Sequence, residues 1–403
     1  MEQLAAETPH TVVERRYSLI TLVFFCSGLF VVAALFSTIP LNPVFMTEFH
    51  LTAERAALAT SICSLCYALG TVVFAPLSDR YGRKRVIILG LLLLTVISPV
   101  IGFLSNYEAI IVFRGIQGFV AASFAPTALT FITELYPPKK RMTAIGVISA
   151  GFLMAGIVGQ VYSSMINGML GWHFVFYIFG LLYLGLAIAF IAVIPRDRVL
   201  DVMEKRSVFG AFPVVLSQSF FRKCYFITVL LLLSFVGMYT ALENYLRDMY
   251  ALEASQILLI RSAGMIGMLL TPFGGRLAER FGTFKTLRSG LALAAIGLFS
   301  VGVSNSIFMI ACMSIVFTAG ISITVPSLIS LLGQIGGKEK ASAMSLYSFF
   351  LFVGSTIGPM IAVFLMKTGN YVLTFGMIAA LLTFGFLTTF PLAKKAAVRR
   401  AES

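Results

Sequence analysis

The chain has 403 residues, of which 59% are hydrophobic and only 12% are charged, and its formal net charge is +13. So few charges cannot cover the surface of a water-soluble protein of this length. The composition therefore excludes an ordinary soluble domain and indicates that the lipid bilayer is the main solvent.

Twelve apolar runs follow one another between Tyr17 and Pro391. A helix of about 20 residues crosses a hydrocarbon core of about 30 Å, so each run is long enough to span a membrane. The runs are continuous and not alternating, which favours helices over the strands of a barrel. We therefore expect an all-α membrane protein with spans near residues 17–39, 54–77, 86–104, 107–132, 143–168, 173–194, 222–246, 255–277, 285–304, 306–333, 341–366 and 371–391.

Lys and Arg are distributed unevenly between the two sides of the predicted membrane. The side of the N-terminus holds 25 of them, and the other side holds only Arg55, Arg247 and Lys367. By the positive-inside rule, both termini are expected in the cytoplasm, with the chain as a multi-pass protein of the bacterial inner membrane. Topology thus explains the basic net charge, and no nucleic-acid partner is expected.

The predicted spans divide into two sets of six. A polar stretch at residues 195–221 is expected to be a cytoplasmic linker between an N-terminal bundle, 1–194, and a C-terminal bundle, 222–403. The segment APLSDRYGRK at 75–84 returns as GGRLAERFG at 274–282, which places Glu279 200 residues after Asp79. Such a repeat indicates a duplicated six-helix unit. Two facing bundles enclose a cleft at mid-membrane, where transporters bind their substrates.

Polar residues share a face on two of the predicted helices. These are Thr60, Ser64, Tyr67 and Thr71 in the second span, and Thr324, Ser327, Ser330 and Gln334 at the tenth. Residues three or four apart lie on the same side of a helix. We expect these faces either to line the cleft, with Tyr67 as a cavity residue, or to bond between packed helices.

The loop at 75–84 resembles the signature loop of the major facilitator superfamily. The matching residues are Asp79, Arg80, Gly82, Arg83 and Lys84, and in the second half Gly275, Glu279, Arg280 and Gly282. A carboxylate here can accept hydrogen bonds from the N-terminus of a neighbouring helix, which would make a latch between the bundles. The resemblance implies that Asp79, Arg83 and Glu134 form a charge relay that closes the cytoplasmic side. The alternative is that these residues only anchor the topology.

Three charged residues, Arg114, Glu243 and Arg261, fall inside predicted spans, where charge is costly and a functional site is the default hypothesis. Arg114-Gly-Ile-Gln117-Gly resembles a motif of the same superfamily, which implies proton coupling or organisation of the cavity by Arg114 and Gln117. A buried arginine can equally bond carbonyls of neighbouring helices. Glu243 is a candidate proton carrier. Alternatively, it forms an i,i+4 pair with Arg247, or it pairs with Arg261, which is itself a candidate for binding an anionic substrate.

Two glycine motifs concern the direction of transport. Residues 151–159, with Gly151, Gly156 and Gly159, resemble a degraded exporter motif of the superfamily, and Gly354-x-x-x-Gly358-Pro is a cleaner version in the eleventh span. Close packing of helices explains both motifs equally well. The resemblance covers essentially the whole chain and is nearest to twelve-helix drug exporters, although no acidic residue occurs in the first span.

The sequence thus predicts a secondary active transporter for a small organic solute, and not an enzyme. The preferred version is a proton-coupled antiporter that exports drugs or metabolites by alternating access; the alternative is a proton-coupled importer of an organic anion. A membrane receptor or an intramembrane enzyme is a distant third reading. No phosphate-binding loop and no pattern of metal ligands is present, so we expect no ATP hydrolysis, no cofactor and no metal. A monomer suffices for this architecture.

Overall fold

The computed structural model describes residues 9–195 and 208–402, and the regular structure in these ranges is helical throughout. The first part of the chain contains α1 (Pro9–Phe36), α2 (Asn42–Glu48), α3 (Ala53–Tyr81), α4 (Arg83–Phe103), α5 (Tyr107–Ala121), α6 (Ala125–Leu135), α7 (Pro138–Leu170) and α8 (Trp172–Val193). The second part contains α9 (Val208–Ser217), α10 (Ser219–Tyr250), α11 (Ala254–Met268), α12 (Thr271–Phe281), α13 (Thr283–Val303), α14 (Ile307–Ile335), α15 (Lys340–Met366) and α16 (Tyr371–Glu402).

Twelve stretches of the described residues are helical, long and apolar enough to cross a membrane, which confirms the predicted number of spans. Two of them are broken where the sequence predicted continuous helices, between α5 and α6 and between α11 and α12. Pro126 and Pro272 lie in the first turns of α6 and α12. Because proline lacks an N–H and its ring collides with the carbonyl four residues earlier, each preceding helix stops short of it.

Three further features of the helices were not predicted. The short helix α2 lies between the first two spans, and α9 occupies residues that were assigned to the linker. The last helix continues to Glu402, beyond the expected end at 391. The rest of the predicted linker, 196–207, lies outside the described residues, and the domain boundaries at 194 and 222 therefore stay predictions.

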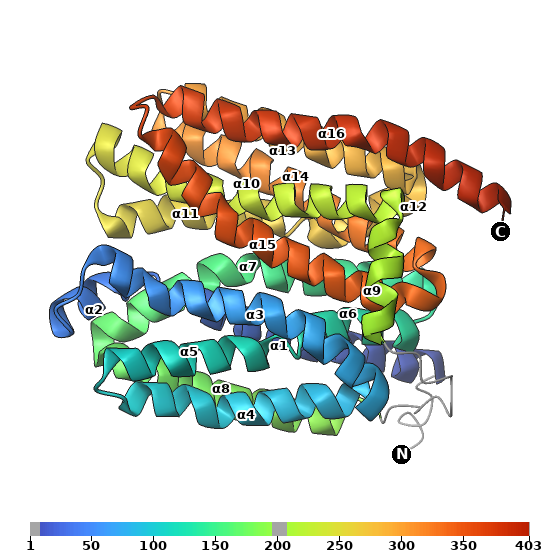
Figure 1. The fold of residues 1–403 in the computed structure, drawn as a ribbon, viewed down its shortest axis with the longest axis horizontal. Helices are drawn as coiled ribbons and strands as arrows, with labels where there is room; N and C mark the ends of the chain where they lie inside the picture. The colour runs from blue at the N-terminus through green and yellow to red at the C-terminus, as the bar shows by residue number, and fades with distance from the viewer. Residues whose placement is uncertain (1–8, 196–207, 403) are drawn as a thin grey trace, which may run out of the picture.

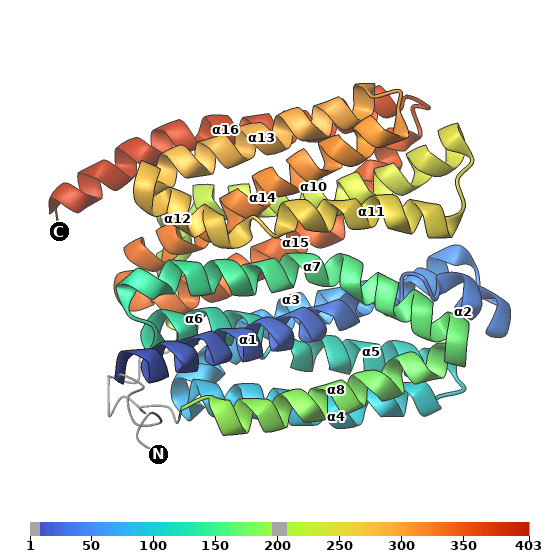
Figure 2. The same ribbon diagram turned by 180° about the vertical axis from the view of Figure 1, so that it is seen from behind.

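The helices form two bundles of six spans each, as the fold class predicted. In Figures 1 and 2, α1 to α8 make one group and α10 to α16 the other. Within the groups, α1 packs on α7 and α3 on α5, while α10 packs on α15 and α13 on α14. Between the groups, α15 contacts α3 and α6, and α7 contacts α11, α12 and α14. Apart from α12, the helices that meet across this interface also line the cavity described below.

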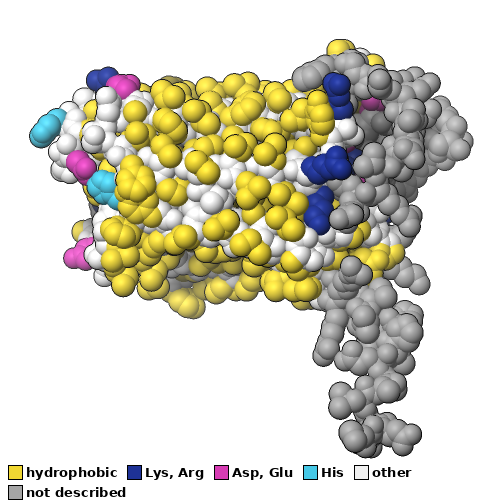
Figure 3. Space-filling model, turned by 90° about the horizontal axis from the view of Figure 1, so that it is seen from below, with side chains coloured by type: hydrophobic (Ala, Val, Ile, Leu, Met, Phe, Trp, Pro, Cys, Tyr) yellow, Lys and Arg dark blue, Asp and Glu magenta, His cyan; other side chains and the backbone are white. Residues whose placement is uncertain are grey.

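The two ends of the molecule differ in charge. The start of α1 and the end of α16 lie at the same end, which we call the terminal end; the opposite end is the distal end (Figure 1). On the face in Figure 3, hydrophobic side chains form a broad band along the molecule, and Lys and Arg gather mainly toward the terminal end. Side chains such as Leu89, Ile188 and Phe308 are more than half exposed within this belt of spans, as expected for surfaces that face lipid.

The two glycine motifs lie at close contacts between helices. A Cβ atom on Gly159 of α7 would be 2.3 Å from the carbonyl oxygen of Ala33 in α1, and one on Gly354 of α15 would be 2.3 Å from that of Val229 in α10. Small residues at these positions let two backbones approach each other, so helix packing accounts for both motifs.

Candidate functional site

The turn between α3 and α4 brings together the three residues of the predicted charge relay. Gly82 joins the two helices with φ +94°, a conformation that other L-residues rarely adopt. Arg83 therefore begins α4 close to the end of α3. Its Nη2 lies 3.0 Å from Oδ1 of Asp79 and 2.8 Å from Oε1 of Glu134 in α6. We call these three residues the Arg83 triad.

The two described ion pairs of the Arg83 triad join helices of the N-terminal bundle. The sequence predicted that the Asp79 carboxylate latches one bundle to the other, whereas its described ion pair joins α3 to α4. Burial raises the pKa of the Asp79 carboxyl, and the neighbouring guanidinium of Arg83 opposes that rise. Because 27% of the Asp79 side chain is exposed, a proton from solution can reach it. Protonation of Asp79 would therefore change the net charge of the triad.

Only part of this arrangement recurs in the second half. Gly282 joins α12 to α13 with φ +91°, as Gly82 joins α3 to α4. However, Thr283 and Gln334 stand 200 residues after the arginine and the glutamate of the triad. Among the residues that the structure describes, Glu279 forms no ion pair. The two halves are therefore alike in backbone and different in charge.

The two remaining basic residues of the predicted gating set lie at the surface. Arg80 and Arg280 each place the guanidinium about 5.4 Å from the ring centre of the following residue, Tyr81 or Phe281. Both are exposed, and they lie in the last turns of α3 and α12. Their position suits anchoring at a membrane surface better than membership of the triad.

Arg114 is fully buried behind the cavity wall. Its guanidinium donates hydrogen bonds of 2.6–3.3 Å to the carbonyls of Ala34, Leu35 and Ala59, to the Thr38 hydroxyl and to Oε1 of Gln117. Gln117 in turn donates to the hydroxyl of Ser98 at 2.8 Å. Neither Arg114 nor Gln117 lines the cavity. The network agrees with the reading in which a buried arginine joins neighbouring helices, and a role of Arg114 and Gln117 in proton coupling stays a prediction.

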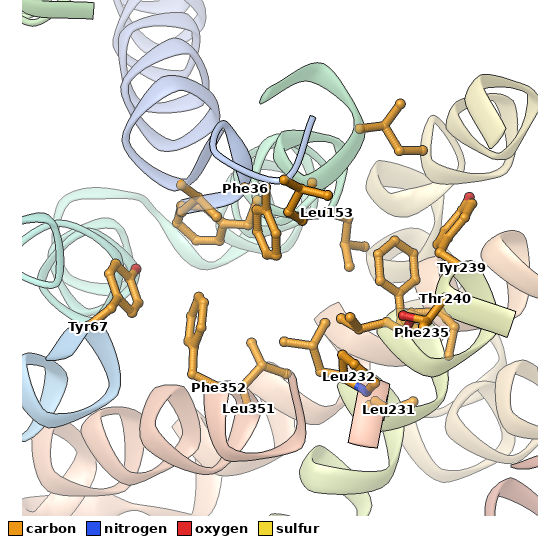
Figure 4. Close-up of a pocket in the computed structure, with 18 of the residues that line it drawn as sticks. Phe36, Tyr67, Leu153, Leu231, Leu232, Phe235, Tyr239, Thr240, Leu351 and Phe352 are labelled. Carbon is orange, nitrogen blue, oxygen red and sulfur yellow. The ribbon is translucent and has the colours of Figure 1, made fainter. Parts of the chain in front are cut away.

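A cavity of about 470 Å³ lies between the bundles, and its middle is apolar and aromatic (Figure 4). Helices α1, α3 and α7 line it from one side, and α10, α11, α14 and α15 from the other. Phe36, Phe235 and Phe352 extend into it from different helices. Tyr67 lines it as predicted, with its ring centre 4.2 Å from that of Phe352. A cavity of this size and lining suits an organic molecule.

The only charged residues that line the described cavity are Glu243 and Arg261. Oε2 of Glu243 accepts a hydrogen bond of 2.9 Å from Nη1 of Arg261, and Oε1 accepts one of 3.0 Å from Nη2 of Arg247. The guanidinium of Arg261 also lies 5.4 Å from the ring centre of Tyr239. The sequence left the partner of Glu243 open between the two arginines, and in the structure it binds both. We call Glu243, Arg247 and Arg261 the Glu243 cluster.

The cavity is closed toward the terminal end and extends toward the distal end. The Ser345 hydroxyl of α15 donates to the carbonyl of Thr71 in α3 at 2.8 Å, near the terminal ends of both helices. There, too, a Cβ on Gly146 of α7 would be only 2.7 Å from Cα of Pro272 in α12. Lining residues such as Tyr347 lie beside this contact, and others, such as Thr60, belong to the distal parts of their helices.

Several polar residues that line the cavity were not predicted from the sequence. Gln160 and Asn244 are uncharged amides within apolar helices, and a search for charges inside spans passes over them. Tyr239 precedes Glu243 by one helical turn, so the i,i+4 rule would have found it. Tyr347 gives no such signal, because one tyrosine in an apolar helix is as often a packing residue as a binding one. The polar face of α14 mostly packs between helices: Thr324 lies against Gly290 of α13.

The two bundles, the central cavity and the glycine turn with its triad all agree with one family. The sequence matches the model of the Major Facilitator Superfamily over residues 24–341 and again over 224–403. The chain belongs to the major facilitator superfamily. It is a multi-pass membrane protein with twelve candidate spans among its described residues.

Several curated relatives of the chain are transporters by name. An uncharacterized MFS-type transporter, YybF, of Bacillus subtilis is 27% identical over 84% of both chains. An uncharacterized transporter of Buchnera aphidicola is 25% identical over 85% of this chain and 84% of its own. Multidrug resistance protein 3 of Bacillus subtilis is 33% identical over 31% of this chain and 24% of its own length.

Proposed function

We propose that this major facilitator protein is a secondary active transporter that exports drugs or metabolites by alternating access in exchange for protons. The observation that carries the proposal is the cavity between the bundles, which is closed at the terminal end and extends toward the distal end. A carrier needs a central site that one side of the membrane reaches at a time. Rocking of the bundles would present the same site to the other side.

The orientation in the membrane is part of the proposal. The terminal end is assigned to the cytoplasm of a bacterial cell because it carries most of the Lys and Arg residues, and the membrane is then the inner membrane. With that orientation, the structure corresponds to an outward-facing state. The Arg83 triad lies on the cytoplasmic side, where it would hold the end of α3 in place while that side is closed.

The lining of the cavity supports an organic solute. Its aromatic and aliphatic middle gives little compensation for removing water from a sugar or an inorganic ion, whereas it can bury the apolar part of an amphipathic molecule. The partial similarity to a multidrug resistance protein agrees with this reading.

Proton coupling is assigned to Glu243. Protonating this carboxylate would weaken its hydrogen bonds with Arg247 and Arg261 and raise the net charge of these three residues from +1 to +2. Binding of a proton and binding of a solute would then be coupled through the same residues. Transport by Glu243→Gln is expected to lose its dependence on the proton gradient; unchanged pH dependence in this variant would eliminate Glu243 as the coupling residue.

The second candidate function is proton-coupled import of an organic anion. One observation favours it: Arg261 places a guanidinium at the cavity wall. Arg114, which the sequence suggested for the same task, does not line the cavity and lends no support. Import and export differ in the direction of transport, and the geometry of one state is compatible with either direction.

Growth of efflux-deficient bacteria tests the direction of transport. Cells expressing the protein are compared with cells expressing Asp79→Asn across antibiotics, dyes and toxic metabolite analogues. Arg55→Gln, which breaks an exposed ion pair with Glu108, is the matched control. Resistance that Asp79→Asn abolishes and Arg55→Gln retains would support export, while hypersensitivity to particular analogues would support import.

Purified protein in liposomes separates a carrier from a receptor or an enzyme. Gradient-driven accumulation of a solute identified by the growth assay is the expected result. If the purified protein moves none of these solutes under any gradient, or converts one of them chemically, the proposal of a secondary transporter is wrong.

A further inference from the structure

The charge of the cavity wall restricts what the cavity can bind. Its described lining has one carboxylate, on Glu243, and that carboxylate already accepts hydrogen bonds from two guanidiniums. The Glu243 cluster therefore carries a net charge of +1. No carboxylate is left over to neutralise an incoming cation.

A cationic solute would be bound unfavourably in such a cavity. It would lose its hydration on entering the aromatic middle, and the one carboxylate of the wall is already paired with two guanidiniums. To gain a partner, it would have to displace Arg261, whose side chain is only 11% exposed. The displaced guanidinium would then be buried without a counter-ion, which is costly.

An anionic solute meets the opposite situation. Nε of Arg261 is buried and has no hydrogen-bond partner among the described residues, and Nη1 donates to Glu243. A carboxylate that replaces Glu243 beside Arg261 would gain a planar donor built for paired hydrogen bonds. Glu243 would keep its contact with Arg247, so the exchange leaves no buried carboxylate unpaired. The ring of Tyr239 beside Arg261 holds the guanidinium in place during the exchange.

The rest of the cavity fits an aromatic body. Phe36, Phe235 and Phe352 line its middle (Figure 4). Two tyrosines, Tyr67 and Tyr347, also line it, and both hydroxyl groups are buried without a hydrogen-bond partner. Buried polar groups without partners are rare and indicate that a partner is missing. A bound molecule with a hydrogen-bonding group at the end remote from its charge would supply one.

We propose that the cavity binds aromatic carboxylates, with Arg261 as the residue that binds the anion and Glu243 as an internal competitor for it. This inference rests on the proposed function, because it names the substrate class of the same cavity. Because a protonated Glu243 would no longer compete for Arg261, a proton and the carboxylate would bind together, which suits the second candidate function better than the first.

Three probes with one aromatic body and different charges test the inference: naphthylacetate, naphthylethanol and naphthylethylammonium. Their binding to the full chain in lipid nanodiscs is measured by calorimetry at neutral pH. Naphthylacetate is expected to bind about tenfold more tightly than naphthylethylammonium, a ratio equivalent to about 1.4 kcal/mol. Naphthylethanol should lie between them. Equal binding of all three, tighter binding of the ammonium, or no binding of the carboxylate would overturn the proposal.

Two substitutions have expected effects of opposite sign. Arg261→Gln should weaken binding of naphthylacetate about tenfold, whereas Glu243→Gln should strengthen it severalfold by removing the competitor. Binding of naphthylethanol should stay within about twofold in both variants, which shows that the cavity is intact. Because misfolding cannot tighten binding, Glu243→Gln keeps the test decisive if Arg261→Gln does not fold. Weaker binding of naphthylacetate by Glu243→Gln would refute the competitor role.

Transport assays distinguish this inference from the proposed function. If the probes bind in the expected order but no gradient moves naphthylacetate across liposomes, the carrier proposal fails and the binding proposal stands. If the protein transports solutes and the order of binding is absent, only the binding proposal fails.

Discussion

Arg114 gains its partners from the end of a helix. The carbonyls of Ala34 and Leu35 lie in the last turn of α1, where carbonyl groups have no amide partner within the helix. A cation is also favoured there by the helix dipole. With a further bond to Ala59 of α3, the guanidinium of Arg114 joins three helices of one bundle. Its location inside a span thus has a structural explanation.

Replacing Arg114 is expected to destabilise the fold. Arg114→Gln would remove the buried hydrogen bonds that join α5 to α1 and α3, and we expect a loss of about 3 kcal/mol in the free energy of unfolding. Arg55→Gln removes an arginine whose side chain is 58% exposed and should cost less than about 1 kcal/mol. Thermal and denaturant unfolding of the two variants in detergent measures the difference. Wild-type stability of Arg114→Gln together with loss of transport would instead indicate a direct role in coupling.

The helices depend on residues that interrupt their regularity. Proline breaks two of the twelve spans, and glycine lets others approach closely. The tightest approach within the N-terminal bundle is between α5 and α3, where a Cβ on Gly118 would be 2.0 Å from the carbonyl oxygen of Cys63. Such a clash involves backbone, which cannot move aside without separating the helices.

Two glycine-to-alanine substitutions separate the cost of a clash between helices from the gain in helix propensity. Gly118→Ala should separate α5 from α3 and lower stability by about 2 kcal/mol or more, since overpacking in a tight core typically costs about 1–3 kcal/mol. Gly185→Ala lies in α8, where a Cβ meets nothing within 4 Å, and should be neutral or slightly stabilising. Unfolding temperatures of both variants provide the measurement. Equal stability of the two would show that α5 and α3 are not in the close contact described.

At the scale of the whole molecule, the closed terminal end decides which side of the membrane reaches the cavity. Contacts of α15 with α3 and of α7 with α12 hold the bundles together there. The described contacts are made by backbone atoms and small side chains, and the two described ion pairs of the Arg83 triad join helices of one bundle. Through these pairs the triad would act on closure by fixing the end of α3.

A larger residue in the α7–α12 contact should open the terminal end. In Gly146→Leu the Cβ atom would collide with backbone atoms of Thr271 and Pro272. In Gly168→Leu, on the same helix, the Cβ atom would have no other atom within 4 Å. Spin labels at the exposed positions Tyr81 and Phe281, in a cysteine-free background, report the separation of the bundles. Gly146→Leu should shift the population toward longer distances, and Gly168→Leu should not. Identical distance distributions would show that this contact does not control closure.

The sequence by itself determined the class of protein, the number of spans and the superfamily. Hydrocarbon offers the backbone no hydrogen-bond partner, so a long apolar run has to form a helix, and that requirement is local in the sequence. The pair of Asp79 and Arg83 was equally predictable, because a glycine turn and a short motif place the two residues next to each other, whereas Glu134 was added only by the resemblance to the superfamily.

Only the tertiary structure decided which intramembrane charges face the cavity. Arg114 and Arg261 look alike in the sequence, yet one is enclosed by carbonyls of its own bundle and the other lies at the cavity wall. Which face of a helix meets a neighbour, and which meets the cavity, depends on the packing of segments that are far apart in the chain. A pattern within one helix carries no information about that choice, since the partners that satisfy a buried charge come from other helices.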